Sequence, residues 1–298
     1  MQNKNVASEK ITQRIILFGL FVIGGLLIFL LGNNWNSLFP TNESTLYKWG
    51  LVLGFLLLTV AFHRSEQWQK YWRIAYALFT ASFANALNWY FGNWLEHLLP
   101  QPGSAAQEIA IDKLAQFVPV VLAIVLLTKV VGDDLGSIFV KKGDLRRGLR
   151  FGLISFGIFA GIFAVIAVLQ AKAPASQGMT AAGVSLDVIF SAIPWILIFA
   201  FANALMEELW FRGIFLKKLN PFLGATASVL ATALVFGIPH LGATYISPVE
   251  MIFFPIIVFG LGLVNGFVMQ KTDSIWGSVL FHAGYDLIII IPVLVSVS

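Results

Sequence analysis

Long apolar runs alternate along the chain with short stretches that hold most of the charged and turn-forming residues. A helix that spans a membrane needs about 20 mostly apolar residues, and nine windows approach that length. We therefore predict an all-α fold, a polytopic bundle of eight to nine transmembrane helices. The windows are 14–32, 46–62, 74–92, 109–131, 149–170, 188–206, 222–241, 250–270 and 275–295.

The overall composition is that of a membrane protein. The chain is 58% apolar and 11% charged, whereas a soluble domain carries about 25% charged residues. These values exclude a soluble globular protein. We expect the chain to lie in the lipid bilayer and to bind no nucleic acid. The chain has no cysteine, which excludes disulfides, thiolate metal sites and a cysteine nucleophile.

The basic residues indicate the orientation of the spans, because cytoplasmic connections collect Lys and Arg. With the N-terminus inside, only Lys48, Lys113 and Lys172 of the 19 Lys and Arg residues fall on the outer side. The acidic residues show no such bias. We therefore expect an integral plasma-membrane protein with a cytoplasmic N-terminus.

The densest basic run, KKGDLRRGLR at 141–150, is interpreted as a cytoplasmic loop that sets the topology. A role in binding lipid headgroups is the alternative. The run separates four spans from the following five, and the intramembrane charges that we single out all follow it. We predict an N-terminal transmembrane portion, 1–148, of unknown role and a transmembrane core, 149–298, that carries the polar motifs.

Ionisable residues inside spans are costly and usually face a bundle interior or a water-filled cavity. The first cluster is Glu207, Glu208 and Arg212, which directly continue an apolar run. On a helix Glu208 and Arg212 share one face and can form an ion pair, while Glu207 projects about 100° away and can meet another group. The alternative is that Arg212 merely snorkels to the headgroups at the wet end of a span.

Two further clusters follow. Gly237 and Pro239 weaken the helix just before His240, so this imidazole is expected on a locally opened turn. His282 and Asp286 lie four residues apart on one helix face inside an apolar run. An ordinary interfacial histidine and a purely structural His–Asp pair remain the alternatives. Together the three clusters could build an activated water with an oxyanion stabiliser, or a metal site.

The ordered set of motifs resembles the CPBP family of intramembrane proteases, which groups CAAX proteases with bacteriocin-processing proteins. The pattern EExxxR stands at 207–212, FxxxH at 236–240 and HxxxD at 282–286. The resemblance covers roughly residues 188–295. No HExxH motif, GxGD motif or G-x-S-G serine is present to indicate another class of intramembrane protease.

The resemblance implies a role for each matching residue. Glu207 and His240 would polarise the attacking water, and Glu208 would pair with Arg212. His282 and Asp286 would stabilise the oxyanion. Asp286 stands where the best-known eukaryotic members have asparagine, and an ionised Asp cannot donate a hydrogen bond. Asp286 would then either orient His282 through a ring nitrogen or be protonated.

The resemblance also implies an activity, an integral-membrane endopeptidase whose substrate is a peptide or protein segment at the membrane. We expect a prokaryotic protein, and both CAAX-type processing and bacteriocin processing or immunity stay open. Family members are described as metalloproteases and as metal-independent glutamate proteases, so a divalent metal such as zinc also stays open. The alternatives are an ion-coupled transporter with a proton relay through Glu207, His240 and His282, and a non-catalytic immunity or scaffold protein.

Simple alternation of the spans creates a difficulty. It places Glu207 and His282 toward the inner face but His240 near the outer end of its span. The groups can meet only if the helix of Glu207 lies deeper or extends beyond Lys217, or if the seventh segment tilts or breaks at Gly237–Pro239. We expect a water-filled cavity near the middle of the membrane.

Overall fold

The computed structural model describes residues 2–32, 41–99, 102–171, 186–242 and 248–297. Within these ranges all regular structure is helical, which confirms the predicted helical membrane bundle. Lys172 lies outside the described residues. The α-helices are α1 (Gln2–Leu26), α2 (Thr41–Arg64), α3 (Trp72–Leu98), α4 (Ala105–Val130), α5 (Leu145–Ala171), α6 (Leu186–Glu208), α7 (Leu216–Leu223), α8 (Ala225–Gly237), α9 (Pro248–Thr272) and α10 (Trp276–Val297).

Five short turns of other helix types join or extend the α-helices. Two are π-helical and three are 3₁₀-helical. They are η1 (Leu27–Leu31), η2 (Gln69–Tyr71), η3 (Leu135–Ile138), η4 (Leu209–Gly213) and η5 (Ile238–Gly242).

Among the described residues, five helical segments are long and apolar enough to cross a membrane. They are Glu9–Leu31, Thr41–Arg64, Ala105–Val130, Phe190–Leu223 and Phe254–Thr272, and the shorter helix Ala225–Leu241 is also apolar. Many large apolar side chains are exposed on α1, α2, α4 and α5, as lipid-facing helices require. The chain is thus an integral membrane protein, and the number of spans stays a prediction.

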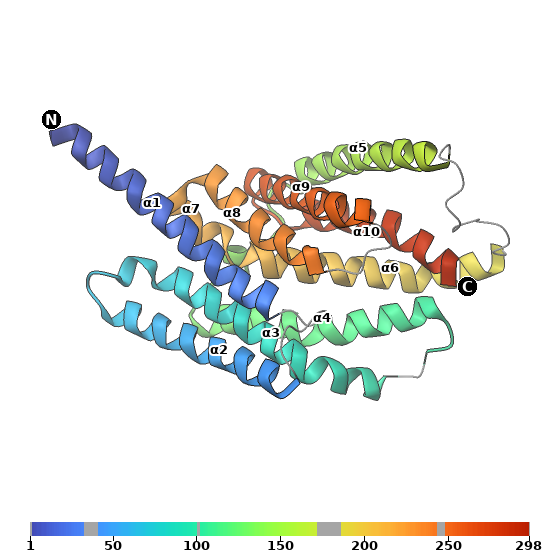
Figure 1. Ribbon diagram of the computed structural model, residues 1–298, viewed down its shortest axis with the longest axis horizontal. Coiled ribbons are helices and arrows are strands. Elements are labelled where there is room, and N and C mark those ends of the chain that lie inside the picture. The colour runs from blue at the N-terminus through green and yellow to red at the C-terminus, as the bar shows by residue number, and fades with distance from the viewer. Residues whose placement is uncertain (1, 33–40, 100–101, 172–185, 243–247, 298) are drawn as a thin grey trace.

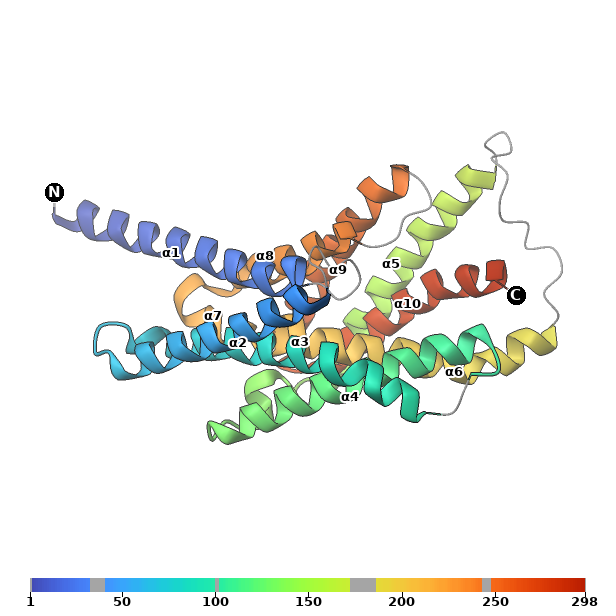
Figure 2. The same cartoon turned by 60° about the horizontal axis from the view of Figure 1, so that its bottom comes forward.

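Helix α6 runs along the middle of the bundle and packs against both α4 and α10 (Figures 1 and 2). Helices α2, α3 and α4 pack in sequence on one side, whereas α5 and α9 both contact α10 on the other. Helix α1 packs against α8 and α7, and the two ends of the chain lie at opposite ends of the long axis in both views. The predicted division between residues 148 and 149 falls inside α5.

The helical path that carries Glu207 is interrupted just after this residue. The segment Phe190–Leu223 has 34 residues, but α6 ends at Glu208, a π-helical turn covers Leu209–Gly213, and α7 begins at Leu216. Helix α8 ends early at Gly237, and η5 carries His240. The break near Gly237–Pro239 is one of the alternatives that the sequence offered for bringing His240 to Glu207, and the depth of the site in the membrane stays a prediction.

Close contact between α5 and α10 depends on glycine. A Cβ atom added to Gly277 would lie 2.5 Å from the backbone oxygen of Gly148, and one added to Gly152 would lie 2.7 Å from the backbone oxygen of Gly277. Real Cβ contacts do not reach such distances. The missing side chains let the two backbones approach closely, as small residues do between membrane helices.

Asp273 links three separate parts of the chain at one end of the bundle. It lies in the turn between α9 and α10 with φ of 51° and forms ion pairs with Lys141, from the connection between α4 and α5, and with Lys217 of α7, at 2.5 Å. Backbone hydrogen bonds from Asp144 to Thr272 and from Ile275 to Phe139 support the same contact. The connections that the basic residues assign to the cytoplasm thus lie together.

This cluster predicts a pH-dependent contribution to stability. Partial burial alone would raise the pKa of the Asp273 carboxyl, but hydrogen bonds from Lys141 and Lys217 outweigh it and lower the pKa. A lowered pKa stabilises the folded state above the unfolded value of about 4 and loses that effect as the pH falls through the folded value. We expect Asp273→Asn to lower the thermal midpoint at pH 7, with the difference from wild type shrinking below pH 4.

The measurement is tryptophan-detected thermal unfolding in one detergent from pH 7 to pH 2.5. Glu66→Gln, which removes an exposed carboxylate from the connection between α2 and α3, is the matched control and should show little difference at any pH. A wild-type advantage over Asp273→Asn that persists unchanged at the lowest pH would contradict this account.

Candidate active site

The structure brings all six predicted site residues into one buried cluster. They come from α6 and η4 (Glu207, Glu208, Arg212), from η5 (His240) and from α10 (His282, Asp286). Each side chain belongs to a residue that is at most 8% exposed, and Glu208 and Arg212 are fully buried. Groups from segments that are 28 to 79 residues apart in the chain therefore meet inside the bundle.

Glu208 is the acceptor around which the cluster is built. Its Oε1 atom accepts hydrogen bonds from Arg212 Nη1, Asn265 Nδ2 and His282 Nδ1, each at 2.7 Å. The predicted ion pair between Glu208 and Arg212 is confirmed. The guanidinium also lies 3.9 Å from the ring centroid of Phe236. One buried carboxylate thus joins α6, α9 and α10, and its arginine partner contacts α8.

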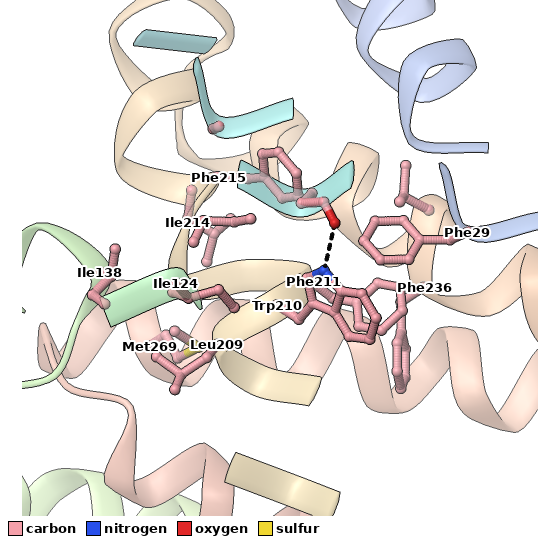
Figure 3. Packing of buried hydrophobic residues seen from close by; sticks show 14 of the residues in the cluster. Phe29, Ile124, Ile138, Leu209, Trp210, Phe211, Ile214, Phe215, Phe236 and Met269 are labelled. Carbon is pink, nitrogen blue, oxygen red and sulfur yellow. Dashed lines mark hydrogen bonds between the residues drawn. The ribbon is translucent and has the colours of Figure 1, made fainter. Parts of the chain in front are cut away.

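The helix changes type at this point. Residues Leu209–Gly213 form a π-helical turn, a feature that occurs often at functional sites. The turn directs Trp210 and Phe211 toward the N-terminal helices, where both rings contact Phe29 (Figure 3). The indole of Trp210 donates a hydrogen bond to the backbone oxygen of Ala81 in α3 at 3.1 Å. The N-terminal helices therefore hold in place the π-helical turn that follows Glu208.

His282 is oriented by Glu208. The ion-paired carboxylate can only accept, so His282 Nδ1 donates the proton of that bond. The opposite nitrogen, Nε2, lies 3.5 Å from Glu207 Oε2 and 3.7 Å from Asp286 Oδ1. Both separations are longer than a good hydrogen bond. Glu208, and not Asp286, is therefore the carboxylate that orients the His282 ring.

Asp286 has a partner that the motifs did not indicate. Its Oδ2 atom accepts a hydrogen bond from Asn203 Nδ2 at 3.0 Å. Asn203 is one helical turn before Glu207 on α6, so it lies on the same face. The amide fixes the carboxyl group of Asp286 at the edge of the cavity described below.

The tautomer of His240 follows from its backbone contact. Its Nδ1 atom lies 2.7 Å from the backbone oxygen of Phe236, and a carbonyl oxygen can only accept. The proton of the neutral ring therefore sits on Nδ1, and the lone pair sits on Nε2. An imidazole in this tautomer can accept a proton from water at Nε2.

Two cavities meet at Glu207 and His240. The first has a volume of about 180 Å³ and is lined also by His282 and Asp286, with Lys113 from α4 on its wall. The second has a volume of about 60 Å³, enough for a few water molecules. Its wall carries the amides Asn85, Asn88 and Gln116 from α3 and α4.

The second cavity contains a buried acceptor that needs a partner. Asn88 Oδ1 has no hydrogen-bond partner among the described residues, although buried polar atoms are nearly always satisfied. A water molecule in the cavity is the expected partner. Residues of the portion 1–148 thus line a polar space that reaches Glu207.

Sequence reasoning missed several of these polar groups. Asn203 and Asn265 lie inside apolar runs, which is the signal that could have marked them, since polar residues within spans are unusual. Lys113 was assigned only to the count of outer basic residues. The amides of α3 and α4 carry no motif at all, and only the packing of α4 on α6 places them near the site.

The residues as placed do not form a zinc site. A zinc ion takes three or four ligands at about 2.0–2.2 Å from nitrogen and oxygen. Among the described residues, no group of three or more His, Cys, Asp or Glu side chains is arranged to hold a metal ion. One oxygen of Glu208, Oε1, already accepts from three donors, whereas Oε2 has no hydrogen-bond partner among the described residues. The chemistry is therefore derived from the side chains alone.

The comparison with known families gives one finding. Residues 189–288 match the family described as Type II CAAX prenyl endopeptidase Rce1-like. This segment, about a third of the chain, is therefore similar to the CAAX-protease family. The six site residues all lie within it, and the family consists of intramembrane proteases. No curated protein and no solved structure matches the chain.

The buried ion pair predicts a large effect on stability. Arg212→Met leaves Glu208 without its cation, and breaking a buried pair in this way costs about 3–5 kcal/mol. The double variant Glu208→Gln/Arg212→Met removes both charges and should recover part of that loss. The measurement is the free energy of unfolding in mixed micelles.

Arg73→Met is the matched control, because Arg73 and Asp133 form an ion pair in which the arginine side chain is 49% exposed. It should cost about 0–1 kcal/mol. Equal losses for Arg212→Met and Arg73→Met would show that the pair of Glu208 and Arg212 has no special role in the fold.

Proposed function

We propose that the chain is an integral-membrane endopeptidase that hydrolyses a peptide bond with a water molecule activated by Glu207 and His240. The observation that supports this most directly is that these two side chains line both cavities. The first cavity offers space for a substrate, and the second offers polar space for water. Glu208 faces away from the cavities and binds Arg212, which leaves Glu207 available for the reaction.

The proposed reaction begins with proton transfer from water. The Glu207 carboxylate and the Nε2 lone pair of His240 polarise the water, whose oxygen attacks the carbonyl carbon of the substrate. The carbonyl oxygen becomes an oxyanion. When the tetrahedral intermediate collapses, the C–N bond breaks and the proton taken from the water passes to the leaving amine nitrogen.

His282 is proposed to stabilise the oxyanion. Its Nδ1 proton is used in the bond to Glu208, so a proton on Nε2 would be the one that faces the cavity. The neighbouring carboxyl oxygens of Glu207 and Asp286 favour a proton at that position. A donor held in place before the reaction stabilises developing charge without reorganisation, and the buried setting strengthens the effect.

The substrate is proposed to be a peptide or protein segment that reaches the membrane. The first cavity has apolar walls that include Phe199, Phe254 and Ile289, which suit an apolar side chain beside the scissile bond. CAAX-type processing and bacteriocin-type processing both fit these walls. The family match favours a peptidase over the transporter and scaffold alternatives. Clustering of the basic connections supports a cytoplasmic N-terminus, and a prokaryotic origin stays a prediction.

Cleavage of a quenched fluorescent peptide library by purified protein tests the proposed base. We expect Glu207→Gln and His240→Ala each to lower kcat by about 10²–10⁴-fold. Glu66→Gln and His97→Ala, which change exposed residues of the same types, should retain full activity. Addition of a chelator should leave the wild-type rate unchanged.

Two results would reject parts of the proposal. Activity that survives in Glu207→Gln would remove the assignment of the base. Activity that disappears with chelator and returns with zinc would replace the metal-independent mechanism.

Asp286 provides a second test. Asp286→Asn keeps an acceptor for Asn203 and adds an N–H donor toward the cavity, so we expect kcat to remain within about tenfold of wild type or to rise. Asp286→Leu removes the acceptor of Asn203 and the carboxyl group that favours a proton on His282 Nε2, so it weakens the donor to the oxyanion and should lower kcat by about 10²–10³-fold. Asp134→Leu, at an exposed aspartate between α4 and α5, is the control. An Asn variant as inactive as the Leu variant would show that the carboxyl group itself is required.

A further inference from the structure

A third hollow lies away from the candidate active site, at the end of the bundle that holds the basic connections. It has a volume of about 290 Å³. Four cationic side chains line it, and they come from two separate parts of the chain. Lys70 belongs to η2, Arg73 begins α3, and Lys217 and Lys218 belong to α7. One carboxylate, that of Asp133, lies on the same wall.

Two of the four cations have carboxylate partners. Arg73 Nη1 contacts both carboxylate oxygens of Asp133 at 2.6 and 2.8 Å. Lys217 Nζ contacts Asp273 Oδ1 at 2.5 Å and the backbone oxygen of Gly136 at 2.6 Å. These pairs hold the walls of the hollow in place. A third carboxylate, that of Asp134, is near enough to Lys218 to act on its charge.

The other two cations have no such partner. Lys218 is half-buried, and its Nζ atom contacts only the neutral oxygens of Ser137, at 3.0 and 3.5 Å. Lys70 is exposed, and its Nζ atom lies 5.0 Å from the ring centroid of Tyr71. Within the described part of the chain, neither ammonium group has a carboxylate within 4 Å. The hollow, which is partly open, therefore carries four cations against the single carboxylate on its wall.

We propose that this hollow binds the phosphate group of an anionic membrane lipid. A phosphate offers several strong acceptor oxygens, which match two ammonium groups and the Ser137 hydroxyl. Basic hollows at the cytoplasmic end of transmembrane helices are suited to such headgroups. The hollow also borders lipid-facing surface, because Val130 at the end of α4 is 76% exposed and Trp68, just before η2, is 46% exposed. Tryptophan favours the level of the headgroups.

A bound phosphate would connect parts of the chain that otherwise share few polar contacts. It would join Lys70, in the connection between α2 and α3, to Lys218 of α7. Two residues separate helix α7 from η4, which carries Arg212 and follows the helix that carries Glu207. Occupancy of the hollow would thus stabilise the attachment of the C-terminal core to the N-terminal helices. This binding does not depend on the proposed peptidase activity.

Lipid binding to the purified full chain tests the proposal. The protein in neutral detergent is titrated with short-chain phosphatidylglycerol, phosphatidylcholine or inorganic phosphate, and binding is followed by native mass spectrometry and by the thermal midpoint. We expect wild type to bind phosphatidylglycerol and to be stabilised by it. Lys70→Gln and Lys218→Gln should each weaken binding about fivefold, since each cation near a membrane surface contributes about that factor.

The matched controls are Lys142→Gln and Arg146→Gln, which remove exposed charges from the basic run 141–150 outside the hollow. They should leave affinity within twofold of wild type. Because Lys70 is exposed, its variant tests the hollow even if Lys218→Gln impairs folding. Equal weakening in all four variants would mean diffuse attraction, and equal binding of phosphatidylcholine would mean no charge recognition. Either result would overturn the proposal, as would stabilisation by inorganic phosphate at the same concentration, which would indicate a site for free anions.

Discussion

The structure depends on one buried charge, the carboxylate of Glu208. An unpaired carboxylate in a membrane interior would be prohibitively unfavourable, and even a paired one is tolerated only when its geometry is well satisfied. Three donors converge on Oε1, from the same helix and from α9 and α10. Arg212 in turn lies over Phe236 of α8. The contacts of this one oxygen link the four segments that form the candidate site, although Glu208 Oε2 and the Nε and Nη2 atoms of Arg212 have no hydrogen-bond partner among the described residues.

The same arrangement gives two adjacent glutamates different roles: Glu208 holds the helices together, and Glu207 is left for the proposed reaction. Glu208 is directed into the protein, and Glu207, about 100° further around the helix, is directed into the cavities. The two imidazoles are held in the same way. Each has its Nδ1 proton held by an acceptor, Phe236 oxygen for His240 and Glu208 for His282. Each ring is thereby fixed in tautomer and direction, and its Nε2 edge is the one that can act.

The site lies where two helices are interrupted. Helix α6 gives way to a π-helical turn immediately after Glu208, and α8 ends at Gly237 after 13 residues, so that the short helix η5 carries His240. The N-terminal helices complete the enclosure, because Phe29 packs on the site helix and α3 and α4 supply polar walls. Residues 1–148 are thus part of the site's surroundings, although no motif marks them.

The sequence by itself determined what depends on spacing along one helix. Apolar runs of sufficient length required a helical membrane protein, and the four-residue separation of Glu208 and Arg212 set their ion pair and turned Glu207 away. Motif order also indicated the family. Only the tertiary structure decided which helices meet, and hence that Glu208, not Asp286, orients His282, and that Asn203 and Asn265 complete the cluster. Contacts between segments far apart in the chain arise from packing, and no periodicity in a single segment contains that information.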